Sequence, residues 1–504
     1  MRSSARRDAV AELVRLGAES RRFESAAHFA EWDQETLMPA GGAAARAGLL
    51  GSLMSVHHER LTGPAYTKAL GRLCDLRTGE PAAGLSPLED SLARGQWRRW
   101  NRARRLPGRL VESIAVASSS SQQAWSVARR KSDFSLLRPH LERLIALKRE
   151  VAQRLGGRHA YDPPLDEYEP GMTVAELDPL LGALEAPLKD LARRAAGRGR
   201  RRAALNARYG DERALDAFVH RLAADMGFDH ARGVIARSAH PFSTGLHPTD
   251  CRFTVRAEGD GLMNQVLSAL HECDHSLYEQ GMDPRWYGTT LARHASLGMH
   301  EAMSRLWENM VGRDPLFWRH RWPALKAAFP KLLKGLSADD VVEHLLHAPP
   351  SPVRLQAGEV AYSLHILLRY RLEKELITGA LKVRDIPEAW NDESKRLLGA
   401  PPPDDRRGCL QDIHWSGGSF GYFPTYALGN LYGAQLFAKF REETPSWPKD
   451  LARGKMTPLK DWLLAKVYRH GRRWPAAELV RRATGEPASA KAFLAHLESR
   501  YGSN

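Results

Sequence analysis

The chain has 504 residues, of which 43% are hydrophobic, 26% charged and 8% aromatic, proportions that are typical of a soluble globular protein. No run of 18 or more apolar residues occurs, which excludes a predicted membrane-spanning helix. The formal net charge is +15, but the basic runs lack the interleaved aromatic residues that stack on bases, so we expect an arginine-rich surface and no specific nucleic-acid partner. Charge-driven nucleic-acid association is the alternative, and steep salt dependence would identify it.

The N-terminal residues are basic but are not followed by the apolar stretch of a signal peptide. Four cysteines, Cys74, Cys251, Cys273 and Cys409, are too far apart for a zinc knuckle or a dense disulfide framework. We therefore predict reduced thiols and a cytoplasmic location.

Helical periodicity dominates the chain. Apolar residues recur at spacings of three and four in residues 9–32, 134–156 and 175–196. Proline- and glycine-rich segments, such as residues 79–87, 347–352 and 399–405, are typical of loops. There is no internal repeat or long low-complexity segment, so we predict one mainly α-helical domain over residues 1–504. Its N-terminal helical part would span about 1–230 and its site-bearing part about 231–504.

Residues 250–259 are the clearest exception. Cys251, Phe253 and Val255 alternate with polar residues there, which is the period of a half-buried β-strand. A strand beside the site described next can offer its backbone groups to an extended peptide. The alternative is a short structural hairpin.

A metal site is predicted in the next helix, residues 261–281, which contains HECDH and ends at Gly281, a residue typical of a helix C-cap. His271 and His275 lie one helical turn apart and can bind one Zn²⁺ through neutral imidazole nitrogens. Glu272 projects about 100° around the helix, where it can reach a water molecule instead of the metal.

The third ligand is expected from a following amphipathic helix, residues 295–314, which carries His300 and Glu301. Glu301, 26 residues beyond His275, is the better candidate because it completes a His₂Glu set. The alternative is an ordinary surface glutamate paired with Arg305 one turn on.

Several motifs in order make the chain resemble the carboxypeptidase Taq family of zinc metallocarboxypeptidases over nearly its whole length. They are WDQETLMPAGGAAARAGLL at 32–50, YDPPLDEYEPGMT at 161–173, HPF at 240–242, DCRFT at 250–254, HECDH at 271–275 and GCLQDIHW at 408–415. The resemblance implies a mainly helical, bundle-like fold with a deep central groove and a small β-sheet beside the metal site, and a homodimer. It also implies broad-specificity release of single amino acids from peptide C-termini.

The resemblance also implies roles for individual residues. His271, His275 and Glu301 would bind Zn²⁺, for which Co²⁺ can substitute, and Glu272 would be the general base. Arg354 would bind the C-terminal carboxylate of the substrate, since a guanidinium offers it a two-pronged match.

Further residues are candidates for contact with the substrate. Arg252 is the alternative to Arg354, and it shares a strand with Thr254. The candidates for the substrate carbonyl or the oxyanion are His240, His414 and Tyr422, although buried hydrogen-bonded side chains would look identical in sequence. The last two substrate-site candidates come from the GCLQDIHW motif: Gln411 is assigned to substrate binding, and Asp412 would orient His414 or a metal ligand.

Three departures from the family pattern bear on activity. Asp274 replaces a glycine before the second histidine, Ala302 and Met303 replace a polar pair, and Gly358 replaces an aspartate. At the border of the metal face, Asp274 could crowd the groove, repel the substrate carboxylate or accept a hydrogen bond behind the ligands. These departures motivate an alternative: an inactive or weakened relative that binds peptide or metal without turnover. An endo-acting or N-terminal peptidase is the nearest enzymatic rival.

Overall fold

The computed structural model describes residues 3–256, 261–347 and 349–502. It is 69% helical and contains one small three-stranded sheet, which confirms the predicted fold class. Among the described residues, no helix combines the length and apolar character that crossing a bilayer requires.

Nine helices precede the sheet in the described part of the chain. They are α1 (Ser3–Thr36), α2 (Ala43–Thr62), α3 (Pro64–Gly71), α4 (Pro87–Arg105), α5 (Gly108–Lys131), α6 (Arg138–Leu155), α7 (Asp162–Tyr168), α8 (Val174–Ala195) and α9 (Glu212–Met226). The predicted helices at 9–32, 134–156 and 175–196 correspond to α1, α6 and α8. Local sequence fixes some of their ends, because Ser86 with Glu89 and Thr173 with Glu176 form capping boxes at the starts of α4 and α8.

The sheet consists of β1 (Gly233–Ser238), β2 (Ser243–His247) and β3 (Asp250–Arg256), in the order β1-β3-β2. β3 is parallel to β1 and antiparallel to β2. The predicted strand at 250–259 is therefore confirmed for 250–256, while 257–260 lie outside the described residues. One expectation needs correction: β3 is paired on both sides, so the edge that could receive a peptide belongs to β2.

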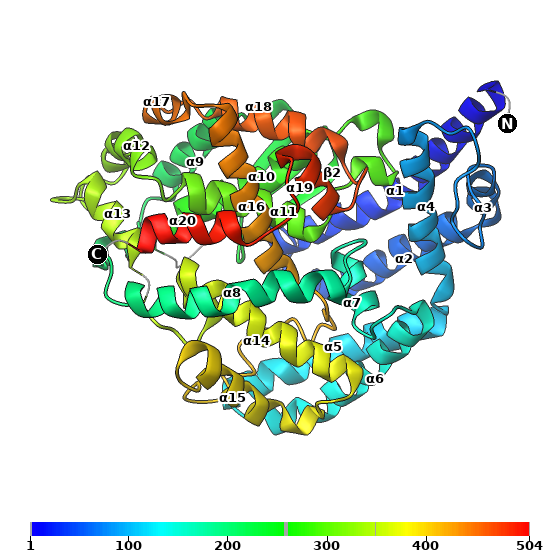
Figure 1. The fold of residues 1–504 in the computed structure, drawn as a ribbon, viewed down its shortest axis with the longest axis horizontal. Helices are drawn as coiled ribbons and strands as arrows, with labels where there is room; N and C mark the ends of the chain where they lie inside the picture. The colour runs from blue at the N-terminus through cyan, green and yellow to red at the C-terminus, as the bar shows by residue number, and fades with distance from the viewer. Residues whose placement is uncertain (1–2, 257–260, 348, 503–504) are drawn as a thin grey trace.

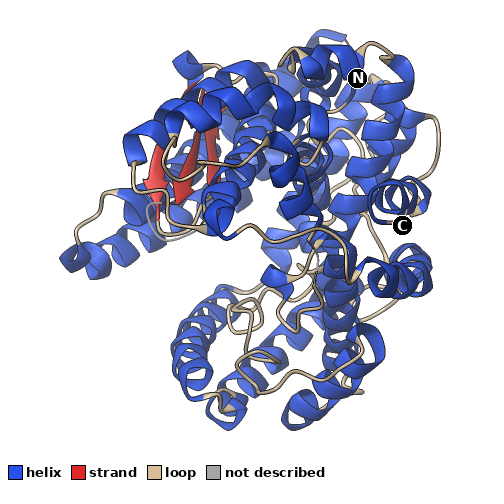
Figure 2. Cartoon of the chain, turned by 90° about the vertical axis from the view of Figure 1, so that its left-hand side faces the viewer, coloured by secondary structure: helices blue, strands red, loops and turns tan. Residues whose placement is uncertain are grey.

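Eleven helices follow the sheet in the described residues. They are α10 (Leu262–Gln280), α11 (Leu297–Arg305), α12 (Pro315–Ala328), α13 (Ala338–Leu346), α14 (Glu359–Thr378), α15 (Ile386–Leu398), α16 (Pro424–Glu443), α17 (Trp447–Ala452), α18 (Thr457–Lys466), α19 (Ala476–Thr484) and α20 (Lys491–Tyr501). In Figure 1, α5, α6, α14 and α15 form the lower part of the molecule, while α10, α11 and α16 lie in the upper part. Figure 2 shows the sheet in the upper part, with helices beside it.

Close helix packing positions the segment that carries Glu301. A Cβ atom on Gly429 of α16 would meet Cγ of Glu301 at 2.8 Å, and one on Gly433 would meet the carbonyl oxygen of Ala302 at 2.6 Å. These two glycines lie one turn apart on α16 and permit the backbone of α11 to approach it. α10 in turn packs against β2, β3 and α11, so Glu301 faces the histidines of α10.

The hydrophobic core of the described residues forms two clusters. The larger extends from Ala128 in α5 to Tyr501 in α20 and so draws on both predicted parts of the chain. The smaller joins the N-terminal helices α1 to α4. The single-domain organisation over residues 1–504 stays a prediction.

Candidate metal centre

The three predicted metal ligands converge. Oε2 of Glu301 lies 3.6 Å from Nε2 of His271 and 4.0 Å from Nε2 of His275, and one possible ligand atom from each residue lies within 4.8 Å of the others. Tetrahedral zinc with bonds of about 2.0–2.1 Å requires ligand atoms about 3.4 Å apart. The donor set and its spacing therefore fit a metal ion with only a small contraction.

A fourth residue supports this ligand set from behind. Nδ1 of His271 donates a hydrogen bond to Oε2 of Glu308 at 2.9 Å, and because a carboxylate can only accept, Nε2 is the ring nitrogen left to face Glu301 as the candidate metal donor. Glu308 lies in the π-helical segment Leu306–Val311, which continues α11. π-helical turns are rare and often occur at functional sites.

The ion pair weighed as an alternative for Glu301 is also present. Nε of Arg305 donates to Oε1 of Glu301 at 2.7 Å, while Oε2 faces the histidines. The two oxygens of one carboxylate thus serve two partners, and Arg305 orients the candidate ligand.

Burial and neighbouring charges set the protonation of the centre. Burial raises the pKa of Glu272 to about 7. Burial, together with His300 and His271, holds the pKa of His275 well below its usual value, so this ring is neutral at pH 7. Against the effect of burial, Glu301 and Glu308 raise the pKa of His271 to about 9.

The centre lies in a cleft of about 920 Å³. The cleft is bordered by α1, β2, α10, α11 and residues before and within α14, and its lining includes His271, Glu272, His275, Glu301, Arg354 and Tyr422. The structure therefore brings the metal-site residues, the predicted base and two of the predicted substrate-contact residues into one cavity.

Arg354 reaches this cleft with most of its side chain buried. Its Nε and Nη2 atoms donate to Oδ1 of Asp412 at 3.2 and 2.8 Å, and Nη1 donates to the hydroxyl of Tyr362 at 2.6 Å. Asp412 was expected to orient His414 or a metal ligand. Its carboxylate instead accepts from Arg354 and also from Arg369 at 2.5 Å.

Gln411 lies behind Arg354 and outside the described cleft lining. Its side-chain oxygen accepts from the backbone N–H of Arg354 at 2.8 Å, and its amide group donates to backbone carbonyls that include those of Pro352 and Arg407. Gln411 thus holds the loop that carries Arg354.

Arg252, Thr254 and His240 are likewise not among the described residues that line the cleft. Arg252 donates to both carboxylate oxygens of Asp250, at 2.7 and 2.9 Å, and lies over the ring of Trp32. Thr254 is fully buried, and its hydroxyl accepts from the backbone N–H of Phe242 at 3.1 Å. His240 is exposed. The structure thus places Thr254 beneath the cleft rim, which Phe242 helps to form.

Aromatic side chains form the wall near Glu301. Tyr422 and Tyr426 line the cleft, and Nε2 of His414 lies 3.4 Å from the hydroxyl of Tyr426. Burial raises the pKa of Tyr422 to about 12, so this hydroxyl remains a donor at neutral pH, and burial lowers the pKa of His414 to about 4. His414 therefore stands behind the tyrosines as a neutral ring.

The residues that depart from the family pattern are absent from the described lining of the cleft. Asp274 is fully buried, and its Oδ1 accepts from the hydroxyl of Tyr468 at 2.6 Å. Ala302 and Met303 are fully buried in the core. Gly358 is the N-cap residue of α14, where an aspartate side chain could cap the helix, and glycine there costs only a few tenths of a kcal/mol. Asp274 is therefore placed neither to crowd the groove nor to repel the substrate carboxylate. Its position agrees with the third alternative, a hydrogen-bond acceptor behind the predicted ligands, and its partner is a tyrosine.

Sequence reasoning missed Glu308, Tyr426 and the edge strand β2. Glu308 lies seven residues beyond Glu301, a spacing that places two residues on one helix face, so a signal for it existed. β2 carried no such signal, because its five residues Ser243–His247 include a glycine and only one strongly apolar residue.

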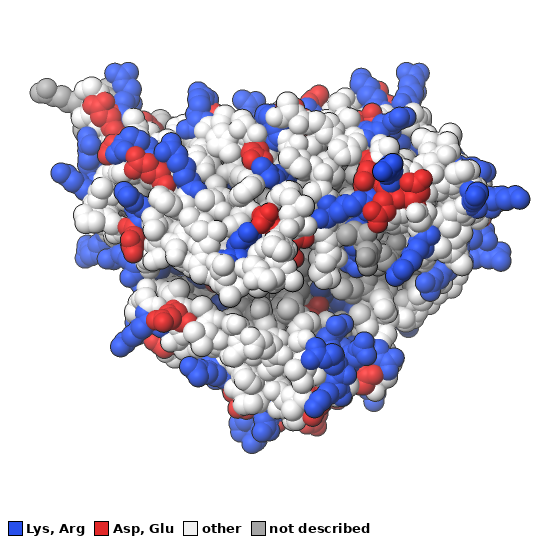
Figure 3. Space-filling view, turned by 180° about the vertical axis from the view of Figure 1, so that it is seen from behind, with Lys and Arg blue, Asp and Glu red and all other residues white. Residues whose placement is uncertain are grey.

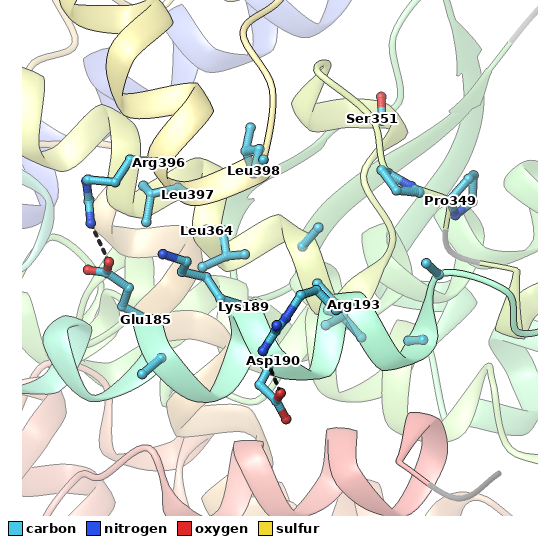
Figure 4. A pocket seen from close by; sticks show the side chains of 18 of the residues that line it. Glu185, Lys189, Asp190, Arg193, Pro349, Ser351, Leu364, Arg396, Leu397 and Leu398 are labelled. Atoms are coloured by element: carbon cyan, nitrogen blue, oxygen red, sulfur yellow. Dashed lines mark hydrogen bonds and ion pairs between the residues drawn. The ribbon is translucent and has the colours of Figure 1, made fainter.

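Another pocket of about 960 Å³ lies on α8, the end of α15 and the loop at 349–351. Figure 4 shows Glu185 paired with Arg396 in this pocket and Asp190 paired with Arg193. It contains none of the predicted site residues, so the functional candidates concentrate in the cleft.

Comparison with known proteins identifies the family. The model of the carboxypeptidase Taq (M32) metallopeptidase family matches residues 12–501. The chain belongs to this family. Its similarity to "Thermostable carboxypeptidase 1" of Thermus thermophilus is 38% identity over 97% of both chains, and to "Carboxypeptidase 1" of Bacillus subtilis 32% over 95% of both. The crystal structure of an M32 carboxypeptidase from Deinococcus radiodurans superposes with a TM-score of 0.92 at 34% identity, covering 98% of this chain and 99% of that one.

Membership of the M32 family confirms the predicted resemblance and the enzyme class, a peptide-hydrolysing metallocarboxypeptidase. It also implies a divalent metal ion and peptide substrates. The identity of the metal, the role of each residue and the oligomeric state stay predictions.

Proposed function

We propose that this M32 protein is a zinc-dependent carboxypeptidase that releases single amino acids from peptide C-termini with broad specificity. The observation that carries the proposal is the convergence of His271, His275 and Glu301 in one cleft with Glu272 and Arg354.

The ligand set would hold the metal through two imidazole nitrogens and one carboxylate oxygen, which suits Zn²⁺ and also Co²⁺. When bound, the ion supplies a Lewis acid that polarises the scissile carbonyl and increases the acidity of water. Glu308 would keep His271 in the tautomer that this binding requires.

Glu272 would act as the general base. A buried carboxylate whose pKa lies near 7 can accept a proton from the attacking water and return it to the leaving amine at neutral pH. Tyr422, with its hydroxyl protonated, would donate a hydrogen bond to the carbonyl oxygen as negative charge develops there. His414 would support the tyrosines from behind, and His240, which directly precedes the cleft-lining Pro241, stays a candidate.

Arg354 would distinguish a chain end from an internal peptide bond. A guanidinium has five N–H groups, and three of those on Arg354 are engaged by Asp412 and Tyr362. The two that remain, one on each terminal nitrogen, can donate in parallel to a C-terminal carboxylate. Gln411 and Thr254 would then serve substrate binding indirectly, by holding the Arg354 loop and the rim at Phe242.

The edge strand β2 offers a place for the substrate backbone. Ser243, Thr244 and Gly245 line the cleft, and among the described strands β2 pairs with β3 alone. Arg21 and Ser25 of α1 donate to the carbonyls of Gly245 and Leu246, so the free part of this edge lies toward Ser243. An extended peptide can add to such an edge through main-chain hydrogen bonds that do not depend on side-chain identity, which agrees with broad specificity.

No observation favours the alternative of an inactive relative. The departures that motivated it, Asp274, Ala302 and Met303, are fully buried and are absent from the described lining of the cleft.

The test is a mass-spectrometric ladder assay on zinc-loaded protein with unmodified and C-terminally amidated peptides. We expect stepwise loss of C-terminal residues from the unmodified peptide, protection by amidation, and loss of activity in Glu272→Gln. Glu375→Gln, which removes an exposed carboxylate on α14, is the matched control. Cleavage of the amidated peptide would instead indicate an endo- or N-terminal peptidase, and no trimming by either protein would support the binding-only alternative.

Two further parts of the proposal concern the whole molecule. A homodimer is tested by light scattering across a concentration series, where monomeric mass throughout would contradict it. The cytoplasmic location is tested by cell fractionation with compartment markers.

A further inference from the structure

A second cluster of metal-ligating side chains lies beside the first. Glu279 follows His275 by one turn on α10, and His300 directly precedes Glu301 on α11. His294 comes from the segment between residues 290–292 and the start of α11. None of these three residues has a role in the proposed reaction.

Two of the three separations in this cluster match those of a tetrahedral metal site. Oε1 of Glu279 lies 3.4 Å from Nε2 of His300 and 3.4 Å from Nδ1 of His294, and the three ligand atoms all lie within 4.8 Å of one another. Metal bonds of about 2.0–2.1 Å require a separation of about 3.4 Å. These two separations are shorter than the 3.6 and 4.0 Å found at the first centre.

One ligand atom of the cluster has only a weak partner. Nε2 of His300 is buried and makes no hydrogen bond of good geometry among the described residues. Its ion-pair contact is with Oε1 of Glu279 at 3.4 Å, and leaving a buried polar atom poorly satisfied is costly. The His300 ring stacks on that of His275 with centroids 4.2 Å apart and an interplanar angle of 7°. The two clusters therefore meet at this pair of stacked rings. His275 belongs to the first cluster with Glu301, and His300 belongs to the second cluster with Glu279.

We propose that Glu279, His294 and His300 form a second divalent-cation site, of the His₂Glu type that takes Zn²⁺ or Co²⁺. All three side chains line the same cleft as the first centre, so the fourth coordination position would be open to solvent or to a ligand in the cleft. The proposal rests on this geometry alone and does not depend on the peptidase activity.

Neighbouring residues define the space and the charge of this site. A Cβ atom on Gly245 of β2 would meet Oε2 of Glu279 at 2.7 Å, so glycine at this position leaves room for the carboxylate. Arg21 would oppose a cation nearby, but Glu24 pairs with it at 2.7 Å.

The experiment measures metal stoichiometry instead of activity. Full-length protein is stripped with a chelator, incubated with excess Zn²⁺ or Co²⁺, freed of unbound metal by gel filtration and analysed by elemental mass spectrometry. We expect two ions per chain in the wild type, one in His294→Ala and one in His271→Ala, and none in the double variant. The visible absorption of the Co²⁺ protein should fall stepwise in the same order.

Gly245→Ala provides a second variant that leaves all ligands in place. It should displace Glu279 and reduce the stoichiometry from two to one, and circular dichroism checks that each variant is folded. The proposal is overturned if the wild type binds one ion that is lost in His271→Ala but kept in His294→Ala. It is equally overturned if two ions remain in His294→Ala, or if no ion binds. The ladder assay reports separately on the proposed function, so the two failures are distinguishable.

Discussion

Glu308 gives the sharpest test of how the centre is built, because it contacts a predicted metal ligand without being one. Its carboxylate accepts a hydrogen bond from Nδ1 of His271 at 2.9 Å, and its side chain is 18% exposed. We expect Glu308→Gln to weaken metal binding moderately and Glu308→Ala to weaken it more strongly.

The magnitudes follow from the hydrogen bond. A bond to a charged group contributes about 1.5–3 kcal/mol, and a neutral bond contributes about 1 kcal/mol. Glutamine keeps an acceptor but loses the charge, so it should cost about 1–1.5 kcal/mol, or roughly tenfold in Kd, at 1.36 kcal/mol per tenfold. Alanine removes the whole bond and should raise Kd by about 10- to 100-fold, the range found for such outer partners of metal ligands.

The assay is competition for Zn²⁺ between the stripped protein and a chromogenic chelator of known affinity. The Glu308 substitutions are made in the His294→Ala variant, so that zinc binding by the second cluster does not contribute to the measured Kd. Glu375→Gln is the control for loss of a carboxylate elsewhere and should leave Kd unchanged. Equal Kd values for the parent, Glu308→Gln and Glu308→Ala would refute the reasoning, because the contact to His271 would then have no energetic consequence.

Three further predictions concern buried carboxylates. Burial raises the pKa of Glu169 from 4.5 to about 7, so this group opposes folding increasingly as the pH rises from about 4.5 to 7. In urea unfolding with a chelator present, the free energy of unfolding of Glu169→Gln should exceed that of the wild type by about 3 kcal/mol at pH 8 and should equal it at pH 4. Asp412→Asn should leave the buried charge of Arg354 unpaired and lower the free energy of unfolding by about 3 kcal/mol. It should also raise KM more than it lowers kcat, and an unchanged KM would contradict the role proposed for Arg354. Asp274→Asn should keep its hydrogen bond with Tyr468, so KM should change less than about twofold; a large change would mean that Asp274 reaches the cleft.

The sequence was sufficient to place the predicted metal ligands close together but not to find the residues that position them. The His271–His275 spacing lies within one helix, where geometry is fixed by the backbone, and the strand at 250–256 follows from a simple alternation. The role predicted for Arg354 came from the family resemblance, because its partner Asp412 lies 58 residues away in the sequence. Such pairings form only when segments distant in the chain pack together, and no local pattern encodes them.

The π-helical turn after α11 shows this limit most clearly. An ideal α-helix continued from Glu301 would advance 100° per residue, and the wider π-helical turn at Leu306–Val311 changes the direction in which Glu308 points. Periodicity alone therefore indicates the face on which Glu308 lies but not the contact that it makes. That contact also requires α11 to be held close to α10, which Gly429 and Gly433 of α16 permit by leaving space where any side chain would collide. The same packing places His300 beside His275, so the small residues of α16, more than 150 positions beyond the HECDH motif, help to place the residue that α11 contributes to each cluster.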